Sequence, residues 1–512
     1  MKLYVEVVAL GMNETINKLN YNKLLEKFSG VTYGGIIVPP KGMNIAESRS
    51  TVSLATKFSK NIDLKIPLVS ANMLDITESE MAIAMAFLGG IGVIHRFCPI
   101  NFQANEIRKV KRAHNFIIND PYKIMPDRKL SEAKELMKKH DVGSLLVHNG
   151  KNKLLGILTK RDIRFVDYVS KVKDRMTPFN GLITAGPKVT LEQVMQKFIK
   201  TKVKKLPLID GKRNILGLIT SKDALRLQKH PDATLDPAGR LRVGAAIGAV
   251  GDYLERAKEL ISAGADAIVL DVTSCHSKIV EKAVKEFRKR LGDTELVVGN
   301  IGTSQQADFL IKLGVDGIKI GVGPGGACTT RRNTGIGVPQ LYAVLETYYG
   351  LRFKYGWKEK DILPLNADGN IRHGADFLHA LLAGASSVMI GTMLSGTLET
   401  PGSIYTKEDG RKFKRFRGMA STEALISRYE SEGIDDPIAE ALKKSPEGLD
   451  REVEIRGSVE DVARNLVGGV RSGISHRGVL SLDHAKKQFD PFNSETGFQI
   501  LSESAQRESY ER

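Results

Sequence analysis

Residues 317–340 read Gly-Ile-Lys-Ile-Gly-Val-Gly-Pro-Gly-Gly-Ala-Cys-Thr-Thr-Arg-Arg-Asn-Thr-Gly-Ile-Gly-Val-Pro-Gln. The stretch begins as a short apolar strand and continues as a loop in which four glycines surround one proline. Glycine permits positive φ and lets a ligand approach the backbone closely. The loop delivers Cys328 next to Arg331 and Arg332. Positive charge and backbone N–H groups favour a thiolate, which is a nucleophile, so the loop predicts a site for covalent catalysis.

On both sides of this stretch, apolar segments of strand length alternate with segments of helical spacing. Eight such strands are expected, at residues 66–73, 89–96, 239–248, 267–272, 295–302, 317–321, 363–369 and 387–392. Eight parallel strand–helix units predict an α/β fold, a (β/α)8 TIM barrel. In that fold the site lies at the carboxyl ends of the strands. The polar or small residues expected there are Asn72, His95, Asp271, Asn300, Cys328, Asp368 and Gly391.

The alternation is interrupted by a segment that repeats internally. Gly156-Ile-Leu-Thr-Lys-Arg-Asp162 recurs as Gly217-Leu-Ile-Thr-Ser-Lys-Asp223, about 60 residues later. Each copy follows a helical segment and an apolar strand. We therefore expect three regions: residues 1–114 as the first part of the barrel, 115–232 as an inserted pair of small units, and 233–512 as the rest of the barrel with its catalytic loop, flap and tail.

Composition limits the classes of function. The chain has 512 residues and a net charge of +17, with 42% hydrophobic and 26% charged residues, as in an ordinary globular protein. A basic surface suits anionic ligands such as nucleotides. No zinc knuckle or aromatic–basic motif occurs, so specific nucleic-acid binding is not expected. Three cysteines, no evident signal peptide and no long apolar run predict a cytoplasmic protein that does not enter a membrane.

The glycine-rich loop resembles that of the IMP dehydrogenase/GMP reductase family, in which a cysteine attacks C2 of a purine nucleotide. Cys-Thr-Thr-Arg after Gly-Pro-Gly is specific to that family, and the resemblance runs from about residue 30 to the C-terminus. Further matching segments are Gly239-Arg-Leu-Arg-Val-Gly-Ala-Ala246, Val298-Gly-Asn-Ile301, Ala367-Asp-Gly369, Met389-Ile-Gly-Thr392, Arg417-Gly-Met419 and Gly468-Gly-Val-Arg-Ser-Gly473.

The resemblance implies roles for individual residues. Cys328 would be the nucleophile, and hydride would pass from the purine to NAD, or in the reverse sense from NADPH in a reductase. The other residues implied in catalysis are Thr330, Arg428, Tyr429 and Glu447. Residues implied in binding the purine nucleoside monophosphate are Asn72, Asp368, Gly369, Gly391, Thr392, Met419 and Glu447. Those implied at the nicotinamide cofactor are Asp271, Asn300, Gly321 and Gly323.

The family also implies a potassium ion and an oligomer. Backbone carbonyls of Gly323, Gly325 and Cys328 would hold K⁺, with Glu508 and Ser509 contributed by a neighbouring subunit. The expected assembly is a homotetramer, with an octamer as a further possibility. The inserted pair resembles tandem CBS domains, in which Thr159 with Asp162, and Thr220 with Asp223, would hold an adenine or guanine nucleotide. Alternatively, each aspartate caps the following helix.

Two reactions of the family stay open at this point. The Arg428-Tyr429 pair and Arg471-Ser-Gly473 favour the dehydrogenase, which converts IMP to XMP, and we take this as the leading interpretation. Asn72-Met73, Asp271-Val272 and Gly418-Met-Ala-Ser421 favour the reductase, which converts GMP to IMP and ammonia. The positions that depart from both patterns are Gly326, Asn370, Ala420 and Cys275. They favour a third alternative, a catalytically impaired protein that senses nucleotides.

Overall fold

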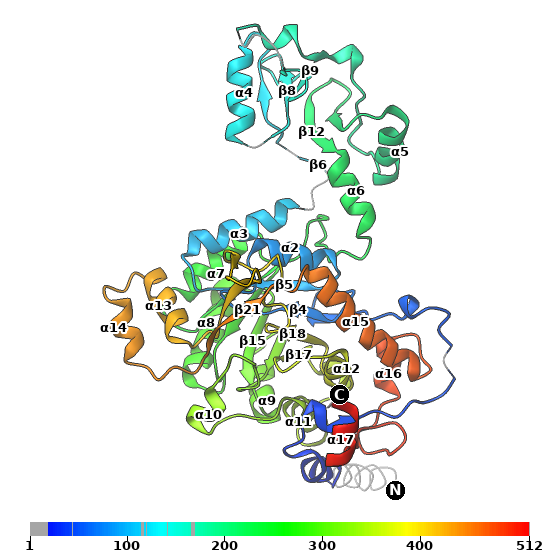
Figure 1. The fold of residues 1–512 in the computed structure, drawn as a ribbon, viewed down its shortest axis with the longest axis vertical. Helices are drawn as coiled ribbons and strands as arrows, with labels where there is room; N and C mark the ends of the chain where they lie inside the picture. Colours follow the sequence, from blue (N-terminus) through cyan, green and yellow to red (C-terminus); the bar gives the residue numbers. More distant parts are fainter. Residues whose placement is uncertain are drawn as a thin grey trace, which may run out of the picture. The chain divides into compact units, whose positions relative to one another are not determined.

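The computed structural model describes residues 19–510, except residues 44, 114–116, 119, 141 and 165–168. The chain divides into two compact units, one formed by the residues up to Ala113 and from Asp232 onward, the other by His114–Pro231. Figure 1 colours the chain along its sequence and labels the elements of both units. The first six residues, on which the absence of a signal peptide was argued, and most of the expected lead-in at 1–30 lie outside the described residues. Within the described part, no helix is both long and apolar enough to cross a membrane.

The first unit is built around a closed barrel of eight parallel strands, which confirms the predicted (β/α)8 fold. Around the barrel the strands follow the order β13-β14-β15-β16-β17-β18-β4-β5. Their bounds are β4 (Leu68–Ser70), β5 (Ile91–Ile94), β13 (Gly244–Ile247), β14 (Ala267–Asp271), β15 (Leu296–Ile301), β16 (Gly317–Ile320), β17 (Leu365–Asp368) and β18 (Ser387–Ile390). Each strand is shorter than its predicted range because the flanking residues turn into loops.

Helices surround these strands, and α8 illustrates why. The Ser277 hydroxyl accepts from the N–H of Val280 and caps its first turn, and Gly292 follows its last residue. Its buried residues, Val280, Ala283, Val284 and Phe287, recur at helical spacing and pack on the barrel. The surrounding helices are α2 (Ser79–Phe87), α3 (Ile100–Ala113), α7 (Tyr253–Ser262), α8 (Lys278–Leu291), α9 (Ser304–Lys312), α11 (Gln340–Phe353), α12 (Gly374–Leu382), α15 (Val459–His476) and α16 (Leu482–Lys487).

Thr77 and Glu80 have the spacing of a capping box, which predicts a helix that begins at Thr77, but this prediction is wrong. Helix α2 begins at Ser79, whose N–H donates to Glu106 Oε2 of α3 at 2.9 Å. The Thr77 hydroxyl instead lies 2.9 Å from Ser70 Oγ and donates to the carbonyl of Ala71 at 2.7 Å. A side chain from a distant segment therefore satisfies the start of the helix, and local sequence cannot reveal such a partner.

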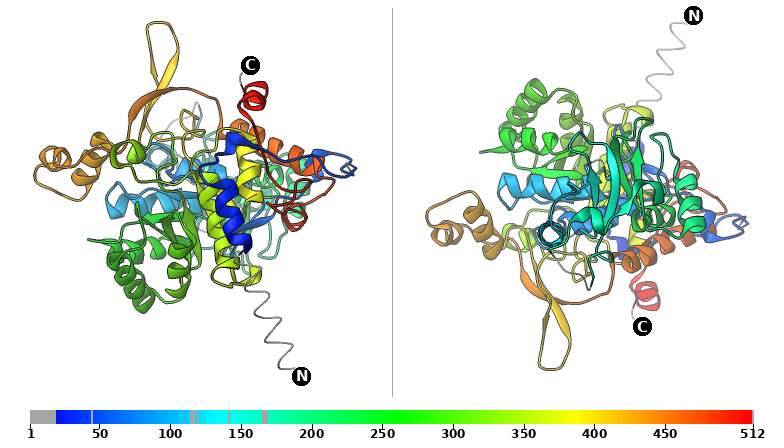
Figure 2. Two further views of the ribbon diagram at one scale, coloured as in Figure 1. Left: turned by 90° about the horizontal axis from the view of Figure 1, so that it is seen from below. Right: turned by 90° about the horizontal axis from the view of Figure 1, so that it is seen from above.

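A hairpin of β2 (Thr56–Ser59) and β3 (Ile62–Leu64) covers the amino-terminal end of the barrel. Phe58, Ile62 and Leu64 are buried in one cluster with barrel-strand residues such as Val69 and Val297. Catalytic groups are thereby confined to the opposite, carboxyl-terminal end. Beyond the last barrel strand, β19 (Tyr405–Thr406), β20 (Lys412–Arg417) and β21 (Asp450–Glu454) form an antiparallel sheet. In sequence, α13 (Thr422–Ser431) and α14 (Pro437–Leu442) lie between β20 and β21. Figure 2 shows the β19–β20 hairpin projecting from this unit.

The second unit consists of two similar halves. In each half a helix is followed by two antiparallel strands: α4 (Leu130–Lys139) with β8 (Ser144–His148) and β9 (Leu154–Thr159), and α5 (Leu191–Thr201) with β11 (Lys205–Ile209) and β12 (Ile215–Thr220). Short strands β7 (Lys123–Ile124), β10 (Thr177–Pro178) and β6 (Ile117–Ile118) complete the sheets, and α6 (Ser221–Lys229) follows β12. Leu146 and Ile157 of the first half pack with Ile215 and Leu218 of the second. The sequence repeat is therefore also a structural repeat.

Candidate active site

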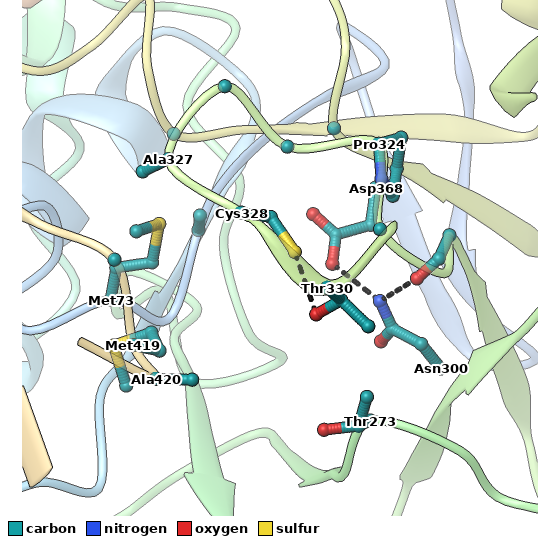
Figure 3. Close-up of a pocket in the computed structure, with 18 of the residues that line it drawn as sticks. Met73, Thr273, Asn300, Pro324, Ala327, Cys328, Thr330, Asp368, Met419 and Ala420 are labelled. Atoms are coloured by element: carbon teal, nitrogen blue, oxygen red, sulfur yellow. Dashed lines mark hydrogen bonds between the residues drawn. The ribbon is translucent and has the colours of Figure 1, made fainter. Parts of the chain in front are cut away.

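A cavity of about 470 Å³ lies where the barrel strands end. Its lining comes from the ends of β14 to β18, from the glycine-rich loop after β16, and from the segment that contains α13. The expected site residues found in the lining are Asn72, Asp271, Asn300, Gly321, Gly323, Gly325, Cys328, Thr330, Asp368, Gly369, Gly391, Thr392, Met419, Arg428 and Glu447. Among the described side chains, those of His95, Tyr429 and Glu508 do not line the cavity, and the side chain of Ser509 lies outside the described part. Figure 3 shows part of this cavity.

The cysteine thiol belongs to a chain of three polar groups. Cys328 Sγ lies 3.1 Å from Thr330 Oγ1, and the Thr330 hydroxyl donates to Glu447 Oε2 at 2.6 Å. Figure 3 shows the first of these contacts. Backbone hydrogen bonds hold the cysteine loop against the segment that carries Glu447. The N–H of Thr329 donates to the carbonyl of Glu447 at 2.8 Å, and the N–H of Glu447 donates to the carbonyl of Ala420 at 2.9 Å. A hydroxyl between a thiol and a carboxylate can transfer a proton from one to the other.

The sequence analysis missed Lys319, which lies at the centre of the site. Its ammonium lies 2.7 Å from Asp271 Oδ1 and 2.7 Å from Asp368 Oδ2, and its side chain is buried. Asp271 also accepts a 2.9 Å bond from Asn72 Nδ2. Burial raises the pKa of Asp271, but the charge and hydrogen bond of Lys319, together with smaller effects of Asn72 and Arg96, outweigh it, and the net pKa lies below its usual value. Burial lowers the pKa of Lys319, but the two carboxylates raise it further, so this lysine stays charged.

Asn300 lines the cavity at the end of β15. Its Nδ2 donates to the carbonyl of Gly321 at 2.6 Å and to Asp368 Oδ2 at 3.0 Å (Figure 3). Its Oδ1 is buried and has no hydrogen-bond partner among the described residues. A buried polar atom without a partner is costly, so a donor on a bound ligand would satisfy it.

Close packing explains two glycines of the loop. A Cβ at Gly321, where φ is +153°, would lie 2.3 Å from the carbonyl oxygen of Asp368. A Cβ at Gly323, where φ is +75°, would lie 2.7 Å from Cγ of Arg331. The Arg331 guanidinium donates to the carbonyl of Val338, so this arginine ties the loop back onto the segment that follows it. Both positions therefore require glycine.

Three of the four positions that depart from the family pattern keep the local geometry. Asn370 adopts a φ of +60°, a conformation that asparagine tolerates better than most residues, so the turn after Asp368 is retained. Ala420 contributes its carbonyl to the N–H of Glu447. Cys275 is buried, its pKa is raised by that burial, and its N–H donates to the carbonyl of Asn300 at 3.1 Å. At the fourth position, Gly326, a Cβ would lie 3.0 Å from Thr392 Oγ1, so the glycine leaves room for that hydroxyl.

Arg428 and Tyr429, which are adjacent in sequence, have different environments. Arg428 lines the cavity from α13, and its Nε lies 2.7 Å from Glu432 Oε1. Tyr429 is buried with Leu425 and Ala441 between α13 and α14. Successive helical residues point in different directions, so only one member of the pair faces the cavity. Arg96, which the sequence analysis did not single out, also lines it, and burial, with a smaller effect of Arg428, lowers its pKa.

The remaining expected site residues lie on other elements. Glu508 is exposed on α17 (Glu503–Tyr510), so a role at the ion site would require a second subunit. In the other unit, Asp162 Oδ2 accepts from both the N–H of Thr159 at 2.7 Å and its hydroxyl at 2.8 Å. The Thr220 hydroxyl donates to Asp223 Oδ2 at 2.5 Å, and Thr220 is the N-cap of α6. The capping role expected of this aspartate therefore belongs to the threonine.

The fold and the site define a class of protein: a parallel barrel equipped for thiol chemistry on a polar ligand. Its carboxyl end carries the cysteine loop, a threonine–glutamate pair and a buried lysine between two aspartates. The chain belongs to the IMP dehydrogenase/GMP reductase family, because the model of the IMP dehydrogenase / GMP reductase domain matches residues 30–511.

Relatives and solved structures agree with this assignment. The inosine-5'-monophosphate dehydrogenase of Nitrosopumilus maritimus is 43% identical over 90% of this chain and 94% of its own length. That of Aquifex aeolicus is 41% identical over 90% and 92%. The crystal structure of a cysteine-to-alanine variant of GMP reductase from Trypanosoma brucei, in complex with guanosine 5'-monophosphate, superposes with a TM-score of 0.82 at 37% identity, covering 94% of this chain and 97% of that one.

Proposed function

We propose that this protein is an oxidoreductase that converts IMP to XMP with NAD⁺ and water, an IMP dehydrogenase. The observation that carries the proposal is the similarity to the dehydrogenases of Nitrosopumilus maritimus and Aquifex aeolicus, at 43% and 41% identity over 90% of the chain. The Cys328–Thr330–Glu447 chain of contacts in the cavity supports it, because the reaction needs a nucleophilic thiol and a group that removes its proton.

The covalent step starts at Cys328. Its proton passes to the Thr330 hydroxyl as that hydroxyl gives its own proton to Glu447, and the thiolate adds to C2 of the purine. The hydride at C2 then leaves, so that C2 is oxidised and stays bonded to sulfur. Water next attacks C2 and gives a proton to the group that activates it, the C2–S bond breaks, and the thiolate and XMP are released. Arg428 lines the cavity and is our candidate for the group that activates this water.

Substrate contacts follow from the strand ends. Asp368 would accept hydrogen bonds from ribose hydroxyls, with Lys319 and Asn300 holding its carboxylate in place. Backbone N–H groups of Gly369 and Gly391 and the Thr392 hydroxyl would bind the 5'-phosphate. Asn72 and Met419 would contact the nucleotide from the remaining lining. These assignments explain why so many polar groups of the cavity lie on successive strands.

The hydride that leaves C2 would be accepted by NAD⁺, the chemistry that this cofactor would supply. The residues that fit it are Asp271, a charged acceptor for hydroxyl groups, and Asn300, whose Oδ1 lacks a partner among the described residues. Gly321 and Gly323 would let the cofactor approach the loop backbone. Backbone carbonyls are suitable ligands for K⁺, and those of Gly323, Gly325 and Cys328 would hold the ion. The carbonyl of Gly325 already accepts a hydrogen bond from the N–H of Cys328 at 3.0 Å, so it would bind K⁺ through its second lone pair.

The second candidate is an NADPH-dependent GMP reductase, which converts GMP to IMP and ammonia. It is favoured by the fold similarity to the Trypanosoma brucei reductase and by the 2.6 Å bond between Thr330 and Glu447, a pair suited to protonating departing ammonia. In this alternative Arg428 has no catalytic role. A protein that only senses nucleotides is the third alternative.

Absorbance of reduced nicotinamide distinguishes these alternatives. Purified full-length protein in K⁺ buffer is given IMP with NAD⁺ in one cuvette and GMP with NADPH in another. A rise in the first alone supports the dehydrogenase, and a fall in the second alone supports the reductase and contradicts our choice. No change in either cuvette, with binding of both nucleotides retained, supports the sensing protein.

We further propose that the unit His114–Pro231 is a tandem CBS module that binds an adenine or guanine nucleotide. The support is its two-fold repeat and the equivalent Thr–Asp contacts at Thr159 and Thr220. A solved GMP reductase from Trypanosoma brucei in complex with guanosine 5'-triphosphate is 34% identical, with a TM-score of 0.73. We also propose a homotetramer in the cytosol, where free thiols such as that of Cys328 persist.

A further inference from the structure

Two arginines lie next to residues that line the cavity, although they are not themselves among its lining residues. Arg456 Nη1 donates to the carbonyls of Thr392 at 3.2 Å and Met393 at 3.4 Å. Arg451 Nη2 lies 3.7 Å from the place that a Cβ at Gly326 would occupy. Gly326 and Thr392 both line the cavity. The two guanidinium groups therefore lie beside the wall formed by the loop after β16 and the end of β18.

The alternation of strand β21 explains why Arg451 faces this wall. Side chains at every second position share one face of a strand. The acidic residues of β21 pair with cations of the β19–β20 hairpin: Asp450 with Arg415, Glu452 with Lys407 and Glu454 with Arg411. Arg451 and Val453 lie on the opposite face. Val453 is buried, and the Arg451 guanidinium lies 5.3 Å from the ring of Phe416, which lines the cavity.

The Arg451 and Arg456 guanidinium groups lie near enough for the charge of one to act on the other. Among the residues that the structure describes, neither Arg451 nor Arg456 has a carboxylate within ion-pair distance. Burial, and then the charge of Arg451, lower the pKa of Arg456, as expected for like charges brought close together. Two neighbouring cations without an acidic partner favour binding of an anion.

The small residue at position 326 makes room for the neighbouring hydroxyl. A Cβ at Gly326 would lie 3.0 Å from Thr392 Oγ1, closer than ordinary van der Waals contact allows. Thr392 Oγ1 and Arg451 Nη2 thus lie 3.0 Å and 3.7 Å from the same point beside Gly326. A hydroxyl donor and a guanidinium converging on a cavity wall suit the oxygens of a phosphomonoester dianion.

We propose that Arg451 binds the 5'-phosphate of the nucleotide substrate and so determines the preference of this site for nucleoside monophosphates over nucleosides. The inference rests on the proposed function, because it takes a purine nucleoside monophosphate as the ligand of the cavity. It also gives a role to the space at Gly326, beside which the Arg451 guanidinium lies. The contact with the phosphate is a charge-assisted hydrogen bond.

The test compares binding of IMP, of GMP and of the nucleosides inosine and guanosine to full-length protein by titration calorimetry. In the Arg451→Met variant the dissociation constants of both nucleotides should rise about ten- to hundred-fold, as for loss of a charge-assisted hydrogen bond. Those of the nucleosides should change less than about twofold. Arg451→Lys, which keeps the charge, should recover part of the loss. Lys412→Met removes one exposed charge from the neighbouring strand β20 and should leave all four affinities unchanged.

Each outcome has a defined meaning. Equal nucleotide affinity in wild type and Arg451→Met overturns the role of Arg451 while leaving the proposed function intact. An equal loss of nucleotide and nucleoside affinity also overturns it, because a general distortion of the cavity would then be the cause. If the wild type binds no purine nucleotide at all, the proposed function fails together with this inference.

Discussion

The ammonium of Lys319 lies 2.7 Å from Oδ2 of Asp368, inside the barrel where strands β16 and β17 end side by side. The same ammonium lies 2.7 Å from Oδ1 of Asp271 on β14. A single buried cation therefore joins the carboxylate assigned to the substrate ribose and the one assigned to the cofactor. Without it, two carboxylates would be buried close together at a cost of several kcal/mol.

We expect Lys319→Met to destabilise the protein by about 3–5 kcal/mol, as for breaking a buried ion pair. Guanidinium denaturation of the full-length protein, followed by circular dichroism, measures this change. The matched control is Lys285→Met, which breaks the exposed pair with Glu281 and should cost less than about 1 kcal/mol. Equal stability of the two variants would contradict the structural role of Lys319.

The barrel was predictable because its strands are apolar runs that end in polar residues, and that pattern depends on local sequence alone. Lys319 was missed because its role depends on distant residues. The local sequence Gly317–Ile320 does not reveal that two aspartates, 48 and 49 residues away in the chain, flank this lysine. The partner of the N–H of Ser79 was missed because Glu106 reaches it from another helix. Tyr429 was assigned with Arg428 because the pair resembles one in the family, whereas the helix places the two side chains in different environments.

Thiol reactivity should distinguish the three cysteines. Cys328 is partly exposed, whereas Cys98 and Cys275 are buried and burial raises the pKa of both, that of Cys98 to about 12. Iodoacetamide at pH 7.5 should therefore modify one thiol per chain, and peptide mass spectrometry should locate it at Cys328. IMP should protect this thiol. Modification of Cys98 at a comparable rate in folded protein would contradict the burial described here.

Cys328→Ser should lower turnover by more than about a thousand-fold, because a serine hydroxyl is far less ionised than a thiol and adds poorly to C2. Binding of IMP should stay within about threefold of wild type, since the nucleotide contacts are made by other residues. The matched control is Cys98→Ala, which removes a buried thiol outside the cavity and should retain full activity. Substantial turnover by Cys328→Ser would exclude the covalent mechanism.

Arg428→Met separates the two halves of the proposed dehydrogenase reaction. Hydride transfer precedes hydrolysis, so the variant should release about one NADH per site in a rapid burst. Its steady-state rate should then be about 10²–10⁴-fold lower than that of wild type, the usual contribution of a general acid or base to the rate. Stopped-flow absorbance measures both phases. Lys443→Met, on the neighbouring exposed surface, should retain the wild-type steady state. A variant that turns over steadily, without a burst, would assign water activation to another group, with Glu447 the next candidate.

Protonation of His379 should make stability depend on pH. This side chain of α12 is buried beside the ring of Phe498, and its Nδ1 has no hydrogen-bond partner among the described residues. Burial lowers its pKa to about 4, only partly opposed by a hydrogen bond with the backbone of Tyr33. Between pH 4 and 6.5 the unfolded chain therefore binds this proton more readily than the folded one. The free energy of unfolding is unaffected by this group above about pH 6.5 and falls as the pH drops below that value.

At pH 5 the loss should be about 2 kcal/mol relative to pH 7.5, from the shift of pKa between the unfolded and folded states. Other groups titrate in the same range, so the measurement compares how far the free energy of unfolding falls between these two pH values in wild type and in His379→Leu. The fall should be about 2 kcal/mol smaller in the variant, whatever its stability at pH 7.5. His484→Leu, at an exposed position of α16, should behave as wild type. An identical fall in wild type and His379→Leu would contradict the lowered pKa of His379 and its burial beside Phe498.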